Sequence, residues 1–220
     1  MSKSVKEQFE VRPIPTEQTK NWILKKHYAK RMPPISYAFG LYDESKSLQG
    51  IMTFGIPASR FDLDFQPYEL NRLVVNEGLG KNVLSYFVGQ TLKKFPEKAC
   101  IVSYADPNNG HHGYIYQATN WIYTGVSSPH DKWFIDGREL HEKSIFNMWG
   151  TNSVEGLKRK GLTVTIEKQE PKHRYFYFIN DEGGVLKGVI LGKYRVLPYP
   201  KGDNLRYDAS YEPTTQGVLI

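Results

Sequence analysis

The sequence has almost no cysteine, no long apolar run and only a modest excess of one charge. Its single cysteine, Cys100, excludes a disulfide bond within the chain. A membrane span would require a run of about 18 apolar residues, and a signal peptide would require an apolar N-terminal segment. The sequence contains neither. These absences predict a soluble cytoplasmic protein that does not bind membranes.

The chain does contain enough apolar sequence to form a core. It has 220 residues, of which 40% are hydrophobic, and a chain of this size can bury a core as one unit. We predict a single domain over residues 1–202. Residues 203–220 offer little to pack and are predicted to be a flexible tail.

Positive charge is concentrated toward the two ends of the chain. The net charge is +6, and Lys and Arg outnumber Asp and Glu in residues 1–31 and 156–207 but not in residues 32–155. If the two flanks fold onto one face, they would form a rim suited to nucleic acid phosphates. The same lysines are equally typical of a solvated surface on any basic protein.

The hydrophobic pattern indicates an α/β order of elements. A helix with Thr16 as its N-cap is followed by a β-hairpin, and strands and helices then alternate. The predicted elements are helix 16–27, strands 35–42 and 48–55, strand 69–75, loop 76–80, helix 81–95, strand 99–104 and a last strand at 175–178.

The stretch from Ser103 to Gly125 is the most informative part of the chain. It places Asp106 directly after a strand, then turn residues, then apolar residues at the helical spacing of Ile115, Ala118, Thr119 and Ile122. A carboxylate at the carboxyl end of a strand lies where open α/β sheets bind ligands. His111 and His112 fall at the predicted helix start, where at most one of the two can face the site.

A short glycine-containing loop is the second chemical feature. Gly78 and Gly80 lie between a predicted strand and a predicted helix, so backbone N–H groups at the helix start could hold a pyrophosphate. A plain turn between a strand and a helix uses the same residues, and the spacing alone does not separate the two readings.

Several short blocks, spread over most of residues 20–201, together carry a family resemblance. They are His27-Tyr28, Glu69-Leu-x-Arg-Leu, Lys81-Asn-x-x-Ser85, Ser103-Tyr-Ala-Asp-Pro, Gly110-His, Tyr116-Gln-Ala-x-Asn-Trp, Lys172-His-Arg-Tyr-x-Tyr-Phe178 and Pro198-Tyr-Pro-Lys201. The set resembles the phage Mom family of DNA adenine-modifying enzymes, within the GNAT-like acyltransferases. The resemblance implies a GNAT-like α/β fold with a mixed, splayed β-sheet flanked by helices.

The resemblance also implies an activity, cofactors and site residues. The activity is attachment of a carbamoylmethyl group to N6 of adenine in duplex DNA, which shields phage DNA from restriction. The donor would be acetyl-CoA or a related acyl-CoA, and iron would activate the methylene carbon. The implied residues are His27, Tyr28, Asp106 and Tyr116 for catalysis, His27 and Asp106 for iron, and Gly78, Gly80, Lys81, Asn82 and Ser85 for the donor. For DNA, the candidates are Lys158, Arg159 and Lys160, a short basic cluster suited to phosphate contacts, together with Arg174.

Other interpretations of the same residues remain open. His27 could only complement a helix dipole, Asp106 could only open a turn, and Tyr116 could be a core residue. An ordinary N-acetyltransferase acting on a small-molecule or protein amine would use the same glycine loop, and a catalytically silent DNA-binding protein could retain the fold. Whether the protein is a monomer or a homodimer is also open. For stacking on a flipped base, the candidate rings are Tyr37, Tyr104, Tyr114 and Trp121.

Overall fold

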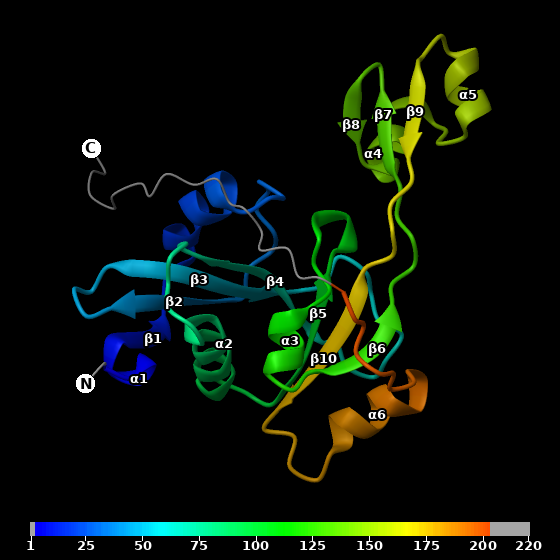
Figure 1. Ribbon diagram of the computed structural model, residues 1–220. Helices are drawn as coiled ribbons and strands as arrows, with labels where there is room; N and C mark the ends of the chain where they lie inside the picture. Colours follow the sequence, from blue (N-terminus) through cyan, green and yellow to red (C-terminus); the bar gives the residue numbers. More distant parts are fainter. Residues whose placement is uncertain (1–2, 203–220) are drawn as a thin grey trace.

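The computed structural model describes residues 3–202, so the predicted tail at 203–220 lies outside the described residues. A seven-stranded sheet with the order β1-β2-β3-β4-β5-β10-β6 forms the centre of the molecule (Figure 1). Its strands are β1 (Phe9–Pro13), β2 (Tyr37–Asp43), β3 (Leu48–Gly55), β4 (Tyr68–Val75), β5 (Ala99–Ala105), β6 (Ile122–Val126) and β10 (His173–Ile179). The hairpin and the strands predicted at 69–75, 99–104 and 175–178 are confirmed.

The sheet is mixed, because one of its neighbouring pairs is parallel. The pairs along β1-β2-β3-β4 and along β5-β10-β6 are antiparallel. Strands β4 and β5 run parallel and pair only through Tyr68 with Ile101 and Glu69 with Val102. Beyond these pairs the two strands separate toward their carboxyl ends. The predicted mixed, splayed sheet flanked by helices is therefore confirmed.

Helices cover both faces of the sheet. The helical elements that belong to the main sheet are α1 (Val5–Gln8), η1 (Thr16–Thr19), η2 (Trp22–Lys26), α2 (Val83–Lys93), η3 (Pro107–Asn109), α3 (Tyr114–Ala118) and α6 (Val185–Lys193). Alternation along β5 divides the core, because neighbouring strand residues point to opposite faces. Ile101 packs in the cluster that contains Phe87 of α2, whereas Val102 packs in the cluster that contains Ile190 of α6.

The predicted helix 16–27 differs from the observed structure. Thr16 opens a 3-10 helix after Pro15 and is not an N-cap, and residues 22–26 form a π-helix. Trp22 is only 3% exposed because it packs in a second apolar cluster with residues of the hairpin strands β2 and β3, among them Leu48 and Ile51. His27 then adopts an extended backbone and ends the helical segment.

Two further helix boundaries differ from the prediction. Asn82 takes a left-handed conformation, so α2 begins at Val83 instead of residue 81. The helix after Gly110 extends only over Tyr114–Ala118, because Ile122 belongs to β6 and pairs with β10. The apolar residues from Ile115 to Ile122, whose spacing predicted one helix, thus form a short helix followed by a strand. His111 and His112 lie in the loop before α3.

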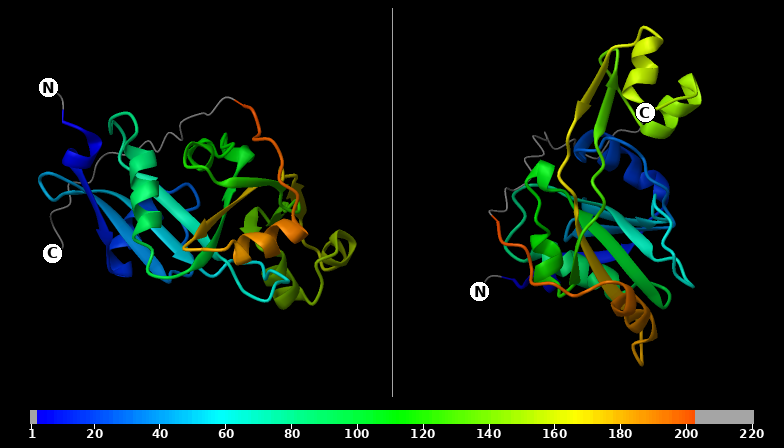
Figure 2. Two further views of the ribbon diagram at one scale, coloured as in Figure 1. Left: turned by 90° about the horizontal axis from the view of Figure 1, so that it is seen from below. Right: turned by 90° about the vertical axis from the view of Figure 1, so that its right-hand side faces the viewer.

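A second, smaller sheet stands apart from the main one (Figures 1 and 2). It has the order β8-β7-β9 and its own apolar cluster around Ile135, Ile145 and Leu157. We call residues 131–168 the arm. Its elements are β7 (Lys132–Ile135), β8 (Arg138–Leu140), α4 (Glu142–Trp149), α5 (Val154–Arg159) and β9 (Val164–Glu167). The sequence patterns did not predict this sheet, because its strands have only three or four residues.

None of the helices in residues 3–202 is both long enough and apolar enough to span a membrane.

Candidate active site between two splayed strands

The candidate site lies where β4 and β5 separate, an opening we call the splay. A buried hydrogen-bond chain crosses its base: the Ser103 hydroxyl lies 2.9 Å from the Leu70 carbonyl oxygen and 2.7 Å from the Tyr116 hydroxyl. A carbonyl can only accept, so Ser103 donates its one proton to Leu70 and the Tyr116 phenol donates to Ser103. Tyr116 therefore joins α3 to both strands.

Tyr116 is held in the core at the base of the splay. It is 8% exposed, and the rings of Trp121 and Tyr175 lie 5.0 and 5.1 Å from its own. Burial raises the pKa of its phenol strongly. Tyr116 is therefore a neutral phenol at physiological pH, suited to positioning the site and not to acting as a phenolate base.

Asp106 lies at the carboxyl end of β5 and is 6% exposed. One carboxylate oxygen accepts hydrogen bonds from the Asn108 backbone and side-chain N–H groups, and the other lies 2.9 Å from Lys172 Nζ. Burial alone would raise the pKa of Asp106, but the hydrogen bonds and charge of Lys172 and the bonds from Asn108 lower it overall. The carboxylate is thus ionised and fixed in direction.

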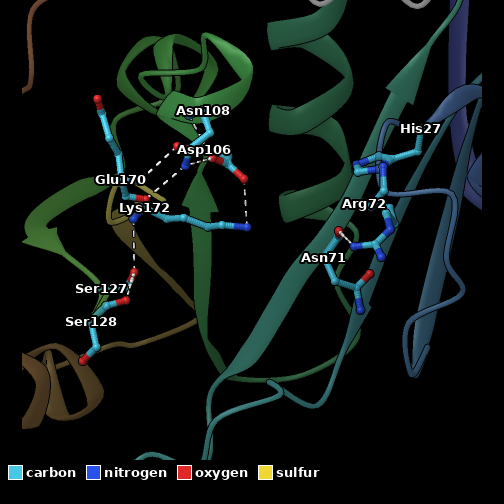
Figure 3. Close-up of polar contacts among 10 residues, drawn as sticks. His27, Asn71, Arg72, Asp106, Asn108, Ser127, Ser128, Glu170 and Lys172 are labelled. Carbon is cyan, nitrogen blue, oxygen red and sulfur yellow. Dashed lines mark hydrogen bonds and ion pairs between the residues drawn. The ribbon is translucent and has the colours of Figure 1, made fainter. Parts of the chain in front are cut away.

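His27 and Arg72 lie on the other side of the splay, and the His27 ring faces the side that holds Asp106 and Lys172 (Figure 3). His27 is 7% exposed. Burial, with smaller contributions from the charges of Arg72, His111 and Lys172, lowers its pKa to about 3. The imidazole is therefore neutral at physiological pH. Lys172 is a shared electrostatic neighbour of His27 and Asp106.

Aromatic contacts bring Tyr28 into the same region. Its ring lies 4.2 Å from that of His27 and 6.2 Å from that of His111. His111 is therefore the member of the His111-His112 pair beside the predicted catalytic residues, and the charge of Asp106 acts on it as well. His112 instead packs near His173, with ring centroids 5.6 Å apart.

The predicted iron ligands do not fit an iron centre as they are placed. His27 Nδ1 accepts a hydrogen bond from the Ala29 N–H at 3.1 Å, so the neutral ring carries its proton on Nε2, whereas metal-binding histidines donate from the nitrogen that does not bind the metal. The Asp106 carboxylate is engaged by Lys172 and Asn108. Residues 3–202 also contain no group of three or more His, Cys, Asp or Glu arranged to hold a metal.

The predicted donor loop lies between β4 and α2. Gly78 has a φ of +72°, which glycine adopts without strain, and a Cβ at Gly80 would meet only Val83 at 4.0 Å. The backbone there is open to a ligand. Lys81 and Asn82 are exposed, whereas the Ser85 hydroxyl donates to the Asn82 carbonyl of its own helix.

The predicted DNA residues fall into two groups. Lys158, Arg159 and Lys160 are exposed at the end of α5 on the arm. Arg174 donates hydrogen bonds to Thr124 and stacks 4.2 Å over the Tyr194 ring. Its guanidinium thus connects β10, β6 and the end of α6. Of the four predicted phosphate contacts, Arg174 is therefore the one whose side chain makes contacts within the fold.

The four aromatic candidates for base stacking are also separated. Trp121 is fully buried, and Tyr37 donates to Glu97 beside Phe95, among the core aromatics beneath α2. Burial raises the pKa of the half-buried Tyr104 to about 12. Tyr114, at the start of α3, is 65% exposed and is the candidate whose ring is most open to a base.

Sequence reasoning missed three charged residues around the splay. Lys172, Arg72 and Glu69 all occur in the blocks that carried the resemblance, but nothing in the sequence assigned them a role. Glu69 is half-buried, and burial raises the pKa of its carboxyl group despite a hydrogen bond from the Ala58 backbone. A buried-strand pattern interrupted by Glu69 and Arg72 was the available signal, since charges on a central strand need a partner or a function.

The splayed mixed sheet, the helices on both of its faces and the polar residues where its strands separate give the chain the GNAT-like α/β fold that the resemblance implied. The sequence profile of the Mom protein family matches residues 8–201, and the chain belongs to this family. It is 25% identical over 199 residues to the methylcarbamoylase Mom of Escherichia phage Mu, covering 81% of this chain and 78% of that protein. The resemblance in the sequence blocks is confirmed.

Solved structures with some likeness include two N-acetyltransferases. Spermidine/spermine N-acetyltransferase SpeG from Vibrio cholerae has a TM-score of 0.47 and 9% identity, covering 82% of this chain and 98% of its own. The GNAT family N-acetyltransferase YhbS from Escherichia coli, in complex with CoA, has a TM-score of 0.38 and 16% identity, covering 55% of this chain and 71% of its own.

Proposed function

We propose that this protein is a transferase that modifies adenine N6 in duplex DNA with a carbamoylmethyl group, as its Mom family membership and its likeness to the phage Mu methylcarbamoylase suggest. The observation that carries the proposal is the arrangement at the splay. An ionised, oriented Asp106 lies on one side of the splay, and His27 faces it from the other side. Tyr116 holds the two strands together at the closed end of the splay.

The chain's own residues can position the amine. Asp106 Oδ1 accepts two hydrogen bonds from Asn108 and Oδ2 faces Lys172, which leaves Oδ2 one acceptor site for the exocyclic N–H of adenine, and Lys172 keeps the carboxylate ionised. The neutral His27 ring carries its proton on Nε2, because its Nδ1 accepts a hydrogen bond from the Ala29 N–H. A donor and an acceptor on opposite walls suit a purine edge, which offers both kinds of group.

We propose an acyl-CoA as the donor, with its pyrophosphate at the loop before α2. The open backbone at Gly78 and Gly80 and the exposed Lys81 support this placement. The chain would bind and orient this donor. Because the residues at the splay do not fit an iron centre as placed, no step here is assigned to iron, and iron dependence stays a prediction.

The test is co-expression of the protein with plasmid DNA, nuclease digestion and mass spectrometry of the nucleosides. We expect a carbamoylmethyl-adenine peak for the wild type and none for Asp106→Asn. Asp62→Asn is the matched control, since Asp62 also pairs with a lysine but lies in the exposed loop before β4, outside the splay and the arm. Unmodified DNA with the wild type would contradict the proposal, and an acetylated small amine would favour the N-acetyltransferase alternative.

A further inference from the structure

We infer that the arm is a docking module for duplex DNA that holds the double helix beside the splay. The inference rests on the proposed function, because it takes duplex DNA as the substrate. It goes beyond the expectation of basic flanks by assigning the contact to one small folded unit, and by explaining how that unit is fixed relative to Asp106.

The arm presents three consecutive cations at its outer end. Lys158 and Arg159 form the last turn of α5 and Lys160 caps it, and all three are exposed. Among the described residues, none of the three takes part in an ion pair, whereas Lys168 of the same arm pairs with Asp131 at 2.6 Å. Figures 1 and 2 show α5 at the end of the arm away from the main sheet. Free cations at this place fit a phosphate backbone.

The arm is built as a unit with a defined shape. Ile145 of α4 and Leu157 of α5 are fully buried against its sheet. The Thr163 N–H donates to Asp136 at 2.8 Å, and the Trp133 indole N–H donates to Glu142 at 2.9 Å. A unit with its own core keeps its surface cations in a fixed arrangement, which a loose loop would not.

Two chain segments join the arm to the main sheet, and both leave the main sheet at the edge where Asp106 lies. In β10, His173 lies opposite Ala105 of β5 and opposite Val126 of β6. The two segments are tied together, because the Ser127 N–H donates to the Lys172 carbonyl at 2.8 Å and the Lys172 N–H donates to the Ser127 hydroxyl at 3.1 Å. The arm therefore projects from the carboxyl end of β5 (Figure 1).

The same base of the arm is bonded directly to the site. The Asn108 side chain bonds the Glu170 backbone in both directions, at 3.1 and 2.9 Å, and also donates to Asp106 (Figure 3). Lys172 reaches the other oxygen of Asp106. A duplex bound by the arm would thus have a fixed orientation relative to the Asp106 carboxylate, which we propose accepts a hydrogen bond from the target adenine.

The first experiment measures duplex affinity as a function of salt. The variant Lys158→Ala/Arg159→Ala/Lys160→Ala should bind about 100-fold more weakly at 0.1 M salt, and its slope of log affinity against log salt should be shallower by about 3, since each phosphate contact contributes roughly 0.9. The control removes the same charge from α2 and α6, as Lys93→Ala/Lys94→Ala/Lys187→Ala. It should bind like the wild type, and both variants should melt at the wild-type temperature.

The second experiment locates the duplex. Cys100 is 3% exposed, so a cysteine placed on the surface can be labelled selectively with a photo-crosslinker. A probe at Asn152→Cys on the arm should crosslink to duplex DNA, and a probe at Lys94→Cys on α2 should not; both positions are exposed. Crosslinking from α2 alone would overturn the inference.

The outcomes separate this inference from the function on which it rests. If the wild type binds and modifies DNA while both triple variants bind equally well, the arm is not the docking module but the proposed function stands. If the wild type neither binds nor modifies duplex DNA, both fail. Phe146 and Met148 on α4 are 54% and 64% exposed, so a change of oligomeric state in the arm variant, seen by light scattering, would instead identify the arm as a protein interface.

Discussion

Replacing Lys172 by Met should destabilise the protein by an amount that depends on pH. The substitution keeps most of the apolar length of the side chain and removes the charge that lies 2.9 Å from the Asp106 carboxylate. Asp106 is left nearly buried, with only the Asn108 hydrogen bonds to hold its charge. The perturbation therefore tests whether the ion pair supports the site as the structure indicates.

The magnitude follows from the exposure of the two groups. Two unit charges about 4 Å apart attract by roughly 4 kcal/mol at an effective dielectric constant of about 20. The Lys172 side chain is 45% exposed and that of Asp106 is 8% exposed, so solvent screening and lost hydration reduce the net contribution to about 1–2 kcal/mol. For a chain of this length that corresponds to a fall in melting temperature of about 3–6 °C near neutral pH.

The pH dependence has a definite sign. The pKa of Asp106 in the folded protein lies below its ordinary value of 3.8, so the ionised carboxylate stabilises the fold above that value, and this contribution is lost as the pH falls through the folded-state pKa. The variant lacks the part that comes from Lys172. The stability difference between wild type and variant should therefore be full at pH 6–7 and shrink as the pH falls below about 4.

Denaturant unfolding at neutral and acidic pH measures this difference. Lys168→Met is the control, because Lys168 also pairs with an aspartate but its side chain is 86% exposed, and surface pairs contribute little. We expect it to cost less than about 0.5 kcal/mol at either pH. If Lys172→Met costs no more than Lys168→Met at neutral pH, or if its cost does not fall in acid, the reasoning about the Asp106 pair is wrong.

Three further predictions concern the donor, the base of the splay and the metal. Gly80→Val should fold normally, since a Cβ there meets only Val83 at 4.0 Å, but coenzyme A should raise the melting temperature of the wild type and not of the variant; equal protection would show that the loop does not bind the donor. Tyr116→Phe should cost about 1 kcal/mol in unfolding free energy, because it removes the hydrogen bond to Ser103 and keeps the ring; an unchanged free energy would contradict that bond. His27→Ala should leave the iron content of the purified protein unchanged, measured by elemental analysis, because its Nδ1 is engaged as an acceptor; a loss of iron would show that His27 binds it.

Local sequence determined five of the seven strands of the main sheet, namely β2, β3, β4, β5 and β10, and the family of the chain. The two apolar runs that flank the polar turn at 43–47, and the apolar strand before Asp106, depend only on neighbours in sequence, and both were predicted correctly. The position of Asp106 at a strand end was also readable, because the Pro107 turn follows it directly. The family was readable from short blocks because each block keeps its own spacing.

Tertiary structure decided what contacts the site residues make. Lys172 lies 66 positions beyond Asp106 in sequence, and no local pattern could pair them; they meet because β10 lies antiparallel to β5 and places His173 opposite Ala105. Pairing with β10 likewise drew Ile122 into a strand although its spacing fitted a helix. The direction of the His27 proton depends on one backbone N–H at the end of a π-helix. Hydrophobic period and turn chemistry are local properties, whereas ion pairs, tautomers and strand order depend on contacts between segments that only folding brings together.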